Sequence, residues 1–166
     1  EVLLNAYRHW GKKCVDHFNG MWSFAILDIA KGLVFCSRDR FGEKPFYYHH
    51  ASTAFSFGSE IRQLIPELHE VVANKSLMHR FLSGLAGEDF SETFFSDINK
   101  LPAGHNLTFT LATNQIDIEC YYELKEHCSD TSLAFDEMEK NFFYLLQDSV
   151  KLRLRSDVVV GTCLSG

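Results

Sequence analysis

The chain has 166 residues, of which 46% are hydrophobic, and this is enough apolar material for a globular domain with a buried core. Its net charge of -6 predicts no general attraction to nucleic acid or to anionic lipid, and no apolar run reaches the roughly 20 residues of a membrane span. Five cysteines without a CxxC pair, and no secretory signal, predict reduced thiols in a cytoplasmic protein.

The first predicted element is a helix over residues 3–10. Leu3, Tyr7 and Trp10 share one helical face, and Gly11 follows them as a typical helix stop. The helical spacing begins at residue 1 without a start Met or a cap, and the chain stops two residues after an apolar run at its other end. Both ends are therefore expected to be internal to a longer protein.

Three pairs of strand-like runs follow, and each pair is joined by a short turn. The six runs are residues 21–28, 33–38, 46–49, 54–57, 106–111 and 116–122. Two helices, at residues 59–64 and 75–85, are predicted between the second and third pairs. The pattern predicts an antiparallel sheet with helices that can cover one face, and the many aromatic strand residues are expected to pack in the core.

The composition changes after residue 124. Residues 125–132 are polar and aperiodic and predict a linker, so the expected domains are residues 1–124 and 125–166. Beyond the linker, residues 135–154 have helical spacing and lead into an apolar run at 158–164 that is typical of a buried strand. A helix followed by such a strand indicates the start of an α/β domain.

The densest polar cluster lies between two apolar strands. It contains Arg38, Asp39, Arg40, Glu43 and Lys44, with Gly42 and Pro45 in the same turn. In one interpretation the acidic and basic side chains form a paired network that fixes a sheet corner. In the other, Arg38 and Arg40 bind an anionic substrate, although no nucleophile or base accompanies them.

The last residues, Leu164, Ser165 and Gly166, follow the predicted strand of the second domain. Ligands bind at the carboxyl ends of strands in open α/β sheets, and a glycine-rich turn there can hold a phosphate. An ordinary exit from a strand into a loop remains the alternative. No Ser-His-Asp or Cys-His pairing is suggested by spacing, and no metal site is predicted at the adjacent His49 and His50.

Several blocks of the sequence, in this order and spacing, resemble the glutamine-hydrolysing asparagine synthetases. The blocks are residues 19–25 (NGMWSFA), 38–48 (RDRFGEKPFYY), 57–61 (FGSEI), 100–105 (KLPAGH) and 150–166. The resemblance implies an α+β fold, namely part of an αββα Ntn-hydrolase-type sandwich, followed by the first helix and strand of an α/β ATP-pyrophosphatase-type domain.

The resemblance also implies a reaction in two halves. An N-terminal Cys hydrolyses glutamine, a second domain uses ATP and Mg²⁺ to convert aspartate to β-aspartyl-AMP, and ammonia passes through an internal tunnel to attack this adenylate. Met21 matches a residue that lines the tunnel, and Leu164, Ser165 and Gly166 match the start of the pyrophosphate-binding loop that contacts ATP. The family allows a homodimer but does not fix the oligomeric state.

The chain departs from the family pattern because it contains neither the N-terminal Cys nor the later part of the ATP loop. The 166 residues alone are therefore expected to catalyse neither half-reaction. Two alternatives remain for the parent protein. One is a β-lactam synthetase-like ATP-dependent ligase, and the other is a non-catalytic scaffold on the same fold.

Overall fold

The computed structural model describes residues 1–85, 91–124 and 134–161. The chain forms two units, Glu1–Glu123 and Leu124–Gly166, and each is described by itself. None of the described helices is long and apolar enough to cross a membrane. The helical segments of the first unit are α1 (Val2–Trp10), η1 (Gly11–His17), η2 (Ile61–Gln63), η3 (Ile65–Glu67) and α2 (Lys75–Leu82).

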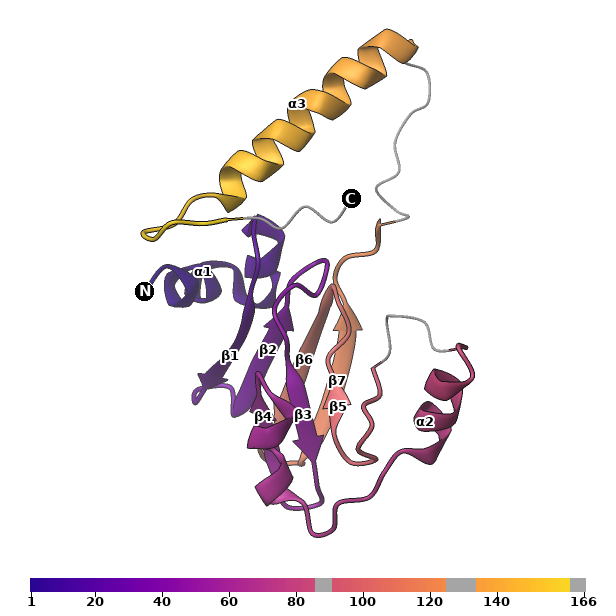
Figure 1. The fold of residues 1–166 in the computed structure, drawn as a ribbon. Coiled ribbons are helices and arrows are strands. Elements are labelled where there is room, and N and C mark those ends of the chain that lie inside the picture. The colour runs from indigo at the N-terminus through magenta and orange to yellow at the C-terminus, as the bar shows by residue number, and fades with distance from the viewer. Residues whose placement is uncertain (86–90, 125–133, 162–166) are drawn as a thin grey trace. The chain divides into compact units, whose positions relative to one another are not determined.

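The strands of the first unit form two antiparallel sheets (Figure 1). One sheet has the order β1-β2-β6-β7 and the other has the order β4-β3-β5. The strands are β1 (Ser23–Asp28), β2 (Leu33–Arg38), β3 (Tyr47–His50), β4 (Phe55–Gly58), β5 (Asn99–Lys100), β6 (His105–Thr110) and β7 (Gln115–Cys120). The three hairpins predicted from the sequence are therefore confirmed.

One face of the four-stranded sheet packs against α1 and η1. Because side chains alternate across a strand, Phe35 and Cys36 of β2 are both fully buried but lie on opposite faces of the sheet. Phe35 stacks on Tyr7 of α1 with 5.5 Å between ring centroids. Helix α1 ends as predicted, since Gly11 has a φ of 62° and its N–H bonds to the carbonyl of Tyr7.

The other face of the four-stranded sheet packs against the second sheet. This inter-sheet core includes Cys36, Leu107 and Phe109 from the first sheet and Tyr48 from β3. Phe55 of β4 stacks on Phe109 of β6 with 4.7 Å between ring centroids. Phe35, Phe46 and Phe55 therefore have the packing role predicted for the aromatic strand residues, whereas Phe57 is 46% exposed.

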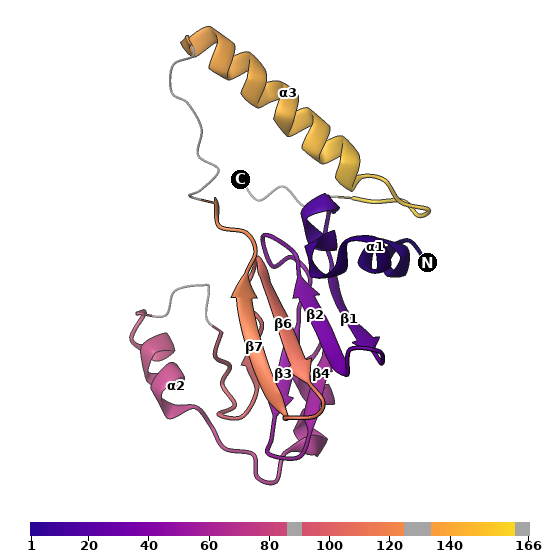
Figure 2. The same cartoon turned by 180° about the vertical axis from the view of Figure 1, so that it is seen from behind.

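The resulting layer order is helix, sheet, sheet, within a mixed α and β fold with antiparallel sheets. Helix α2 lies on the far side of the sheets from α1 in both views (Figures 1 and 2). Leu77, the buried residue of α2, belongs to neither of the two core clusters. The described residues thus establish three of the four layers expected of an αββα sandwich.

A pair of hydrogen bonds ties the loop of one hairpin to the loop of another. Asn114, between β6 and β7, has a positive φ of 53°. Its amide nitrogen donates to the carbonyls of Ala51, at 2.9 Å, and Ser52, at 3.0 Å, between β3 and β4. His50 lies 2.9 Å from the carbonyl of Asn114. This Asn114 clasp joins the two sheets at their hairpin ends.

Two details of the first unit differ from the prediction. The helix predicted at residues 59–64 is only the short 3₁₀ turn η2, and η3 follows it, because Pro66 within η3 has no N–H to continue an α-helix. The two-residue strand β5 was not predicted, since a run this short carries no alternation that a sequence could show.

The described part of the second unit contains one long helix, α3 (Phe135–Arg153), as predicted. The strand predicted at residues 158–164 is wrong over its described part, because residues 158–161 form no strand and Val159 is fully exposed. A strand requires a hydrogen-bonded neighbour, and the described residues of this unit supply none. Residues 162–164 lie outside the described residues, so the start of an α/β domain remains a prediction.

Candidate functional site

The charged turn after β2 is organised by the carboxylate of Asp39, which is 1% exposed. Its Oδ1 accepts the N–H groups of Phe41, at 3.2 Å, and Glu43, at 2.9 Å. Its Oδ2 accepts the N–H groups of Trp22, at 3.3 Å, and Lys44, at 2.9 Å. One buried carboxylate therefore closes the turn and attaches it to the start of β1.

The guanidinium of Arg38 donates hydrogen bonds to two carbonyl groups of the same turn and to one carbonyl group shortly before β6. It donates to the carbonyls of Lys44, at 2.8 Å, Gly42, at 2.5 Å, and Leu101, at 2.7 Å. The planar fork of an arginine suits several acceptors at once, which a lysine could not reach together. Tyr121 donates its hydroxyl to the carbonyl of Arg38, and burial raises the pKa of Tyr121, so this phenol stays a donor.

Arg40 connects the turn to the segment before β1. It donates to the carbonyl of Phe18 at 2.5 Å, and its guanidinium lies 5.5 Å from the ring centroids of both Trp22 and Tyr122. Such a cation between two rings gains from their quadrupoles as well as from the hydrogen bond. In one interpretation of the sequence these charges pair with each other, whereas the hydrogen bonds of Asp39 and Arg40 end on backbone groups.

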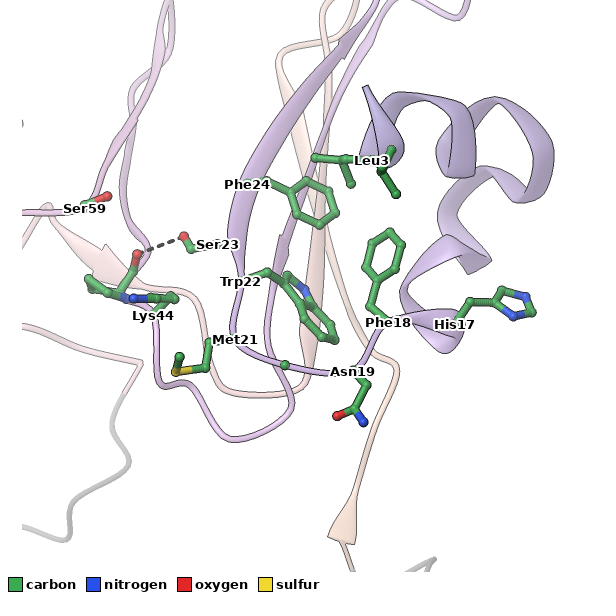
Figure 3. Close-up of a pocket in the computed structure, with 13 residues that line it drawn as sticks. Leu3, His17, Phe18, Asn19, Met21, Trp22, Ser23, Phe24, Lys44 and Ser59 are labelled. Atoms are coloured by element: carbon green, nitrogen blue, oxygen red, sulfur yellow. Dashed lines mark hydrogen bonds between the residues drawn. The ribbon is translucent and has the colours of Figure 1, made fainter. Parts of the chain in front are cut away.

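A cavity of about 710 Å³ opens where this turn meets β1 (Figure 3). Strand β1 contributes Ser23 and Phe24, the residues before it contribute Met21 and Trp22, and α1 contributes Leu3. The charged turn contributes Lys44 and Pro45, and Ser59 adds a further hydroxyl. The cavity is thus built from four segments that are separate in the sequence.

The start of β1 divides the lining of this cavity into two sides. Met21 and Ser23 lie on the side of Lys44, and Trp22 and Phe24 lie on the side of Leu3 (Figure 3). This follows from the alternation of side chains along an extended chain. Ser23 donates its hydroxyl to the carbonyl of Pro45 at 2.8 Å, so the strand and the charged turn are also bonded on the Met21 side.

Of the predicted site residues, the structure describes Met21 but not the three residues expected to bind ATP. Met21, proposed for the tunnel, lines the cavity and is 44% exposed. Leu164, Ser165 and Gly166, expected to bind ATP, lie outside the described residues. Ser23 and Ser59 also line the cavity but were not predicted, because a serine in or near an apolar strand gives no signal by itself.

Two of the three described cysteines, Cys14 and Cys36, are poor nucleophiles, whereas Cys120 is exposed. Cys14 and Cys36 are buried, and burial raises the pKa of both thiols, that of Cys36 to about 12. Their thiolates are therefore scarce at neutral pH. Among the residues that the structure describes, no three His, Cys, Asp or Glu side chains are grouped closely enough to hold a metal ion.

Comparison with protein families matches residues 1–122 to the glutamine amidotransferase domain. This match covers most of the chain, and the two antiparallel sheets are in keeping with it. The chain belongs to the glutamine amidotransferase domain family.

The chain is also similar to proteins named as glutamine-hydrolysing asparagine synthetases. It is 40% identical over 172 residues to one from Methanocaldococcus jannaschii, covering 100% of this chain and 32% of the relative. Asparagine synthetases 3 and 2 of Bacillus subtilis are each 37% identical over all of this chain, which covers 26% and 23% of them. The chain thus spans less than a third of the length of these relatives.

Proposed function

We propose that the protein containing this chain is a glutamine-dependent asparagine synthetase. Glutamine and water give glutamate and ammonia, while aspartate and ATP give β-aspartyl-AMP and pyrophosphate. Ammonia then attacks the activated carboxyl carbon, and AMP leaves as asparagine forms. The first half-reaction follows from the amidotransferase family, and the second is carried over from the names of the relatives.

One observation carries this proposal beyond glutamine hydrolysis. The amidotransferase match ends at residue 122, but the similarity to the named synthetases extends over the whole chain, including the second unit. A protein that shared only the amidotransferase domain with them would lose the similarity near residue 122. The second unit therefore supports a synthetase.

The cavity beside β1 suits the transfer of ammonia. Its apolar side chains include Leu3, Phe18 and Phe24 on one side of β1 and Met21 on the other side, which it shares with the polar Ser23, Lys44 and Ser59. Ammonia must stay unprotonated to act as a nucleophile, and an apolar passage keeps out the water that would protonate it or hydrolyse the adenylate. We propose that the ammonia path runs past Met21.

ATP and Mg²⁺ are the expected reaction partners of the second domain. By the proposal, Leu164, Ser165 and Gly166 begin the loop that binds pyrophosphate. These residues lie outside the described part of the chain, and no described side-chain cluster fits a metal ion. No step is therefore assigned to Mg²⁺ on residues of this structure.

The test is an assay of the full-length protein with aspartate and ATP, once with glutamine and once with ammonium. Asparagine from both donors is the expected result. Asparagine from ammonium alone would remove the glutaminase half of the proposal. No asparagine from either donor would refute the proposal and favour a β-lactam synthetase-like ligase or a scaffold.

A second assay concerns the 166 residues alone. Because residue 1 of this polypeptide is Glu and not the Cys nucleophile of the family, we expect it to release no glutamate from glutamine. The full-length protein, assayed in parallel, is the positive control. Glutamate release by the purified chain at the rate of the full-length protein would refute this expectation.

A further inference from the structure

We propose that Asp39 is a positioning residue for ammonia transfer, because its carboxylate fixes the separation of the two segments that border the passage at Met21. This inference rests on the proposed function and assigns a role within that same site. Asp39 lines no part of the cavity itself and would act through the residues that it holds.

The two segments are joined through one buried oxygen atom. Oδ2 of Asp39 accepts the N–H of Trp22 at 3.3 Å and the N–H of Lys44 at 2.9 Å. Trp22 directly follows Met21, and Lys44 itself lines the cavity together with Pro45. The position of this oxygen therefore sets how far the Met21 segment lies from the charged turn.

Two further hydrogen bonds also hold the start of β1 to the charged turn. The N–H of Asp39 donates to the carbonyl of Trp22 at 2.9 Å, so Asp39 bonds to both the N–H and the C=O of Trp22. The hydroxyl of Ser23 donates to the carbonyl of Pro45 at 2.8 Å. The attachment thus has a strong component at Asp39 and a weaker one at Ser23.

A carboxylate is needed at this position because it offers only acceptors. Four backbone N–H groups point at its two oxygens, and an amide in its place would present an NH₂ group to two of them. Donors facing donors repel, so the turn would move away from β1. A displacement of about 1 Å at a passage can cost far more function than it costs stability.

The test is isotopic competition in the full-length enzyme. The enzyme receives aspartate, ATP and glutamine labelled with heavy nitrogen at the amide, together with unlabelled ammonium in the solution. The measured quantity is the fraction of asparagine that carries the label. This fraction does not depend on how much of the enzyme is folded, so a loss of stability alone leaves it unchanged.

We expect Asp39→Asn to lower the labelled fraction by about twofold or more, because ammonia released from glutamine escapes or exchanges at the loosened passage. Asp117→Asn, the same chemical change at an exposed position of β7, should leave the fraction at the wild-type value. Ser23→Ala should give a smaller decrease than Asp39→Asn. A wild-type fraction in the Asp39→Asn enzyme overturns the proposal.

If Asp39→Asn yields no folded protein, Ser23→Ala decides, and an unchanged labelled fraction in that variant overturns the proposal. The failure of the proposed function is recognised separately. If the proposed function is wrong, the wild-type enzyme itself forms no asparagine, and the proposed role of Asp39 is then also refuted.

Discussion

Arg38 and Asp39 are neighbours in the sequence and are both buried, yet they serve opposite halves of the peptide backbone. Asp39 accepts from N–H groups, while Arg38 donates to carbonyl groups of the same turn. A turn without regular secondary structure leaves both kinds of group unpaired, and each would be costly to bury alone. A pair of adjacent residues with opposite charge satisfies both kinds, while the pair adds no net charge.

The packing around Gly42 leaves no room for a side chain in this turn. Its φ is 67°, and a Cβ there would lie 2.9 Å from Cζ of Arg38 and 3.1 Å from Cβ of Ala103. The Arg38 guanidinium is held by three carbonyls and cannot move aside without losing them. Gly42→Ala should lower the free energy of unfolding by about 2 to 4 kcal/mol, measured by chemical denaturation of the full-length protein.

Gly32→Ala is the matched control for Gly42→Ala. Gly32 has a similar φ of 63°, but nothing lies within 4 Å of an added Cβ. Gly32→Ala should therefore lower the free energy of unfolding only by the cost of placing an alanine in the left-handed backbone region, about 1 to 2 kcal/mol. Equal losses of stability in the two variants would show that the contact with Arg38 costs nothing.

Cys36 should resist alkylation in the folded protein. Burial raises its pKa to about 12, so the neutral thiol predominates well above the pH at which an unfolded cysteine ionises. Since the folded pKa lies above the unfolded one, the stabilisation by Cys36 is complete below the unfolded pKa and is lost as the pH rises toward about 12. Peptide mass spectrometry after iodoacetamide treatment at about pH 8 checks the expectation.

The exposed Cys120 provides the comparison in this experiment. It should be modified in the native protein, and Cys36 only after addition of denaturant. Modification of Cys36 at the rate of Cys120 under native conditions would contradict its burial.

At the scale of elements, the sequence predicts those features that have a strong period or a definite stop. The three hairpins and α1 were found because strand alternation, helical spacing and Gly11 are local signals. The strand prediction is wrong at residues 158–161 because apolar, β-branched residues show that a strand would be buried, not that a partner strand is present. The helix predicted at 59–64 failed because Pro66 lies too close downstream.

The packing of the two sheets depends on a few aromatic rings. Phe109 of β6 is 7% exposed and stacks on Phe55 of the opposite sheet. Phe109→Ala should lower the free energy of unfolding by about 3 to 5 kcal/mol, because it leaves a cavity between the sheets. Chemical denaturation of the full-length protein measures the loss.

Phe57→Ala, in the sheet of Phe55, is the matched comparison. Phe57 is 46% exposed, so about 1 to 2 kcal/mol is expected from its partial burial. If Phe57→Ala proved as costly as Phe109→Ala, the inter-sheet core would not be where the structure places it.

The attachment of α1 to the β1–β2 hairpin should depend on pH. Asp28 accepts the Tyr7 hydroxyl at 3.1 Å and pairs with Lys31 at 3.1 Å. Desolvation alone would raise the pKa of Asp28, but the hydrogen bonds from Lys31 and Tyr7 outweigh it and lower this pKa. A carboxyl group with a lowered folded pKa stabilises the fold above its unfolded pKa, and this stabilisation is lost as the pH falls through the folded value.

Asp28→Asn should therefore be less stable than the wild type at neutral pH, and the difference should begin to shrink near pH ~4 and vanish only below the lowered pKa of the folded protein. Asp117→Asn, on exposed β7, is the control and should follow the wild type throughout. Urea denaturation at several pH values measures the differences. A difference for Asp28→Asn that stayed constant into acid would contradict the role of its charge.

At the scale of the whole molecule, the two units differ in how they treat apolar side chains. The first unit buries its apolar residues in two clusters, whereas α3 exposes Phe142, Tyr144 and Leu145 by more than half. Exposed apolar patches of this kind are typical of surfaces that contact other protein.

Part of the candidate site could not be predicted from the sequence, since the contact of Ser23 with Pro45 joins residues 22 positions apart.

The exposed face of α3 leads to a prediction about solubility. A polypeptide of residues 1–166 should self-associate and bind a hydrophobic dye more strongly than one of residues 1–124, because it carries α3. Size-exclusion chromatography and dye fluorescence at matched concentration compare the two. If the longer polypeptide were monomeric and bound no dye, the apolar side chains of α3 would be buried within the same polypeptide, and the prediction would be wrong.

The Asn114 clasp has a consequence for protein engineering. Surface hairpin loops are usually the safest places for an inserted epitope or label, because they tolerate changes of length. Here the carbonyls of Ala51 and Ser52 are both held by a side chain from another hairpin, so an added residue would shift at least one of them out of reach. The length of the loop between β3 and β4 is thus fixed by its bonds to the other sheet. A label inserted there would alter the structure that it is meant to report on.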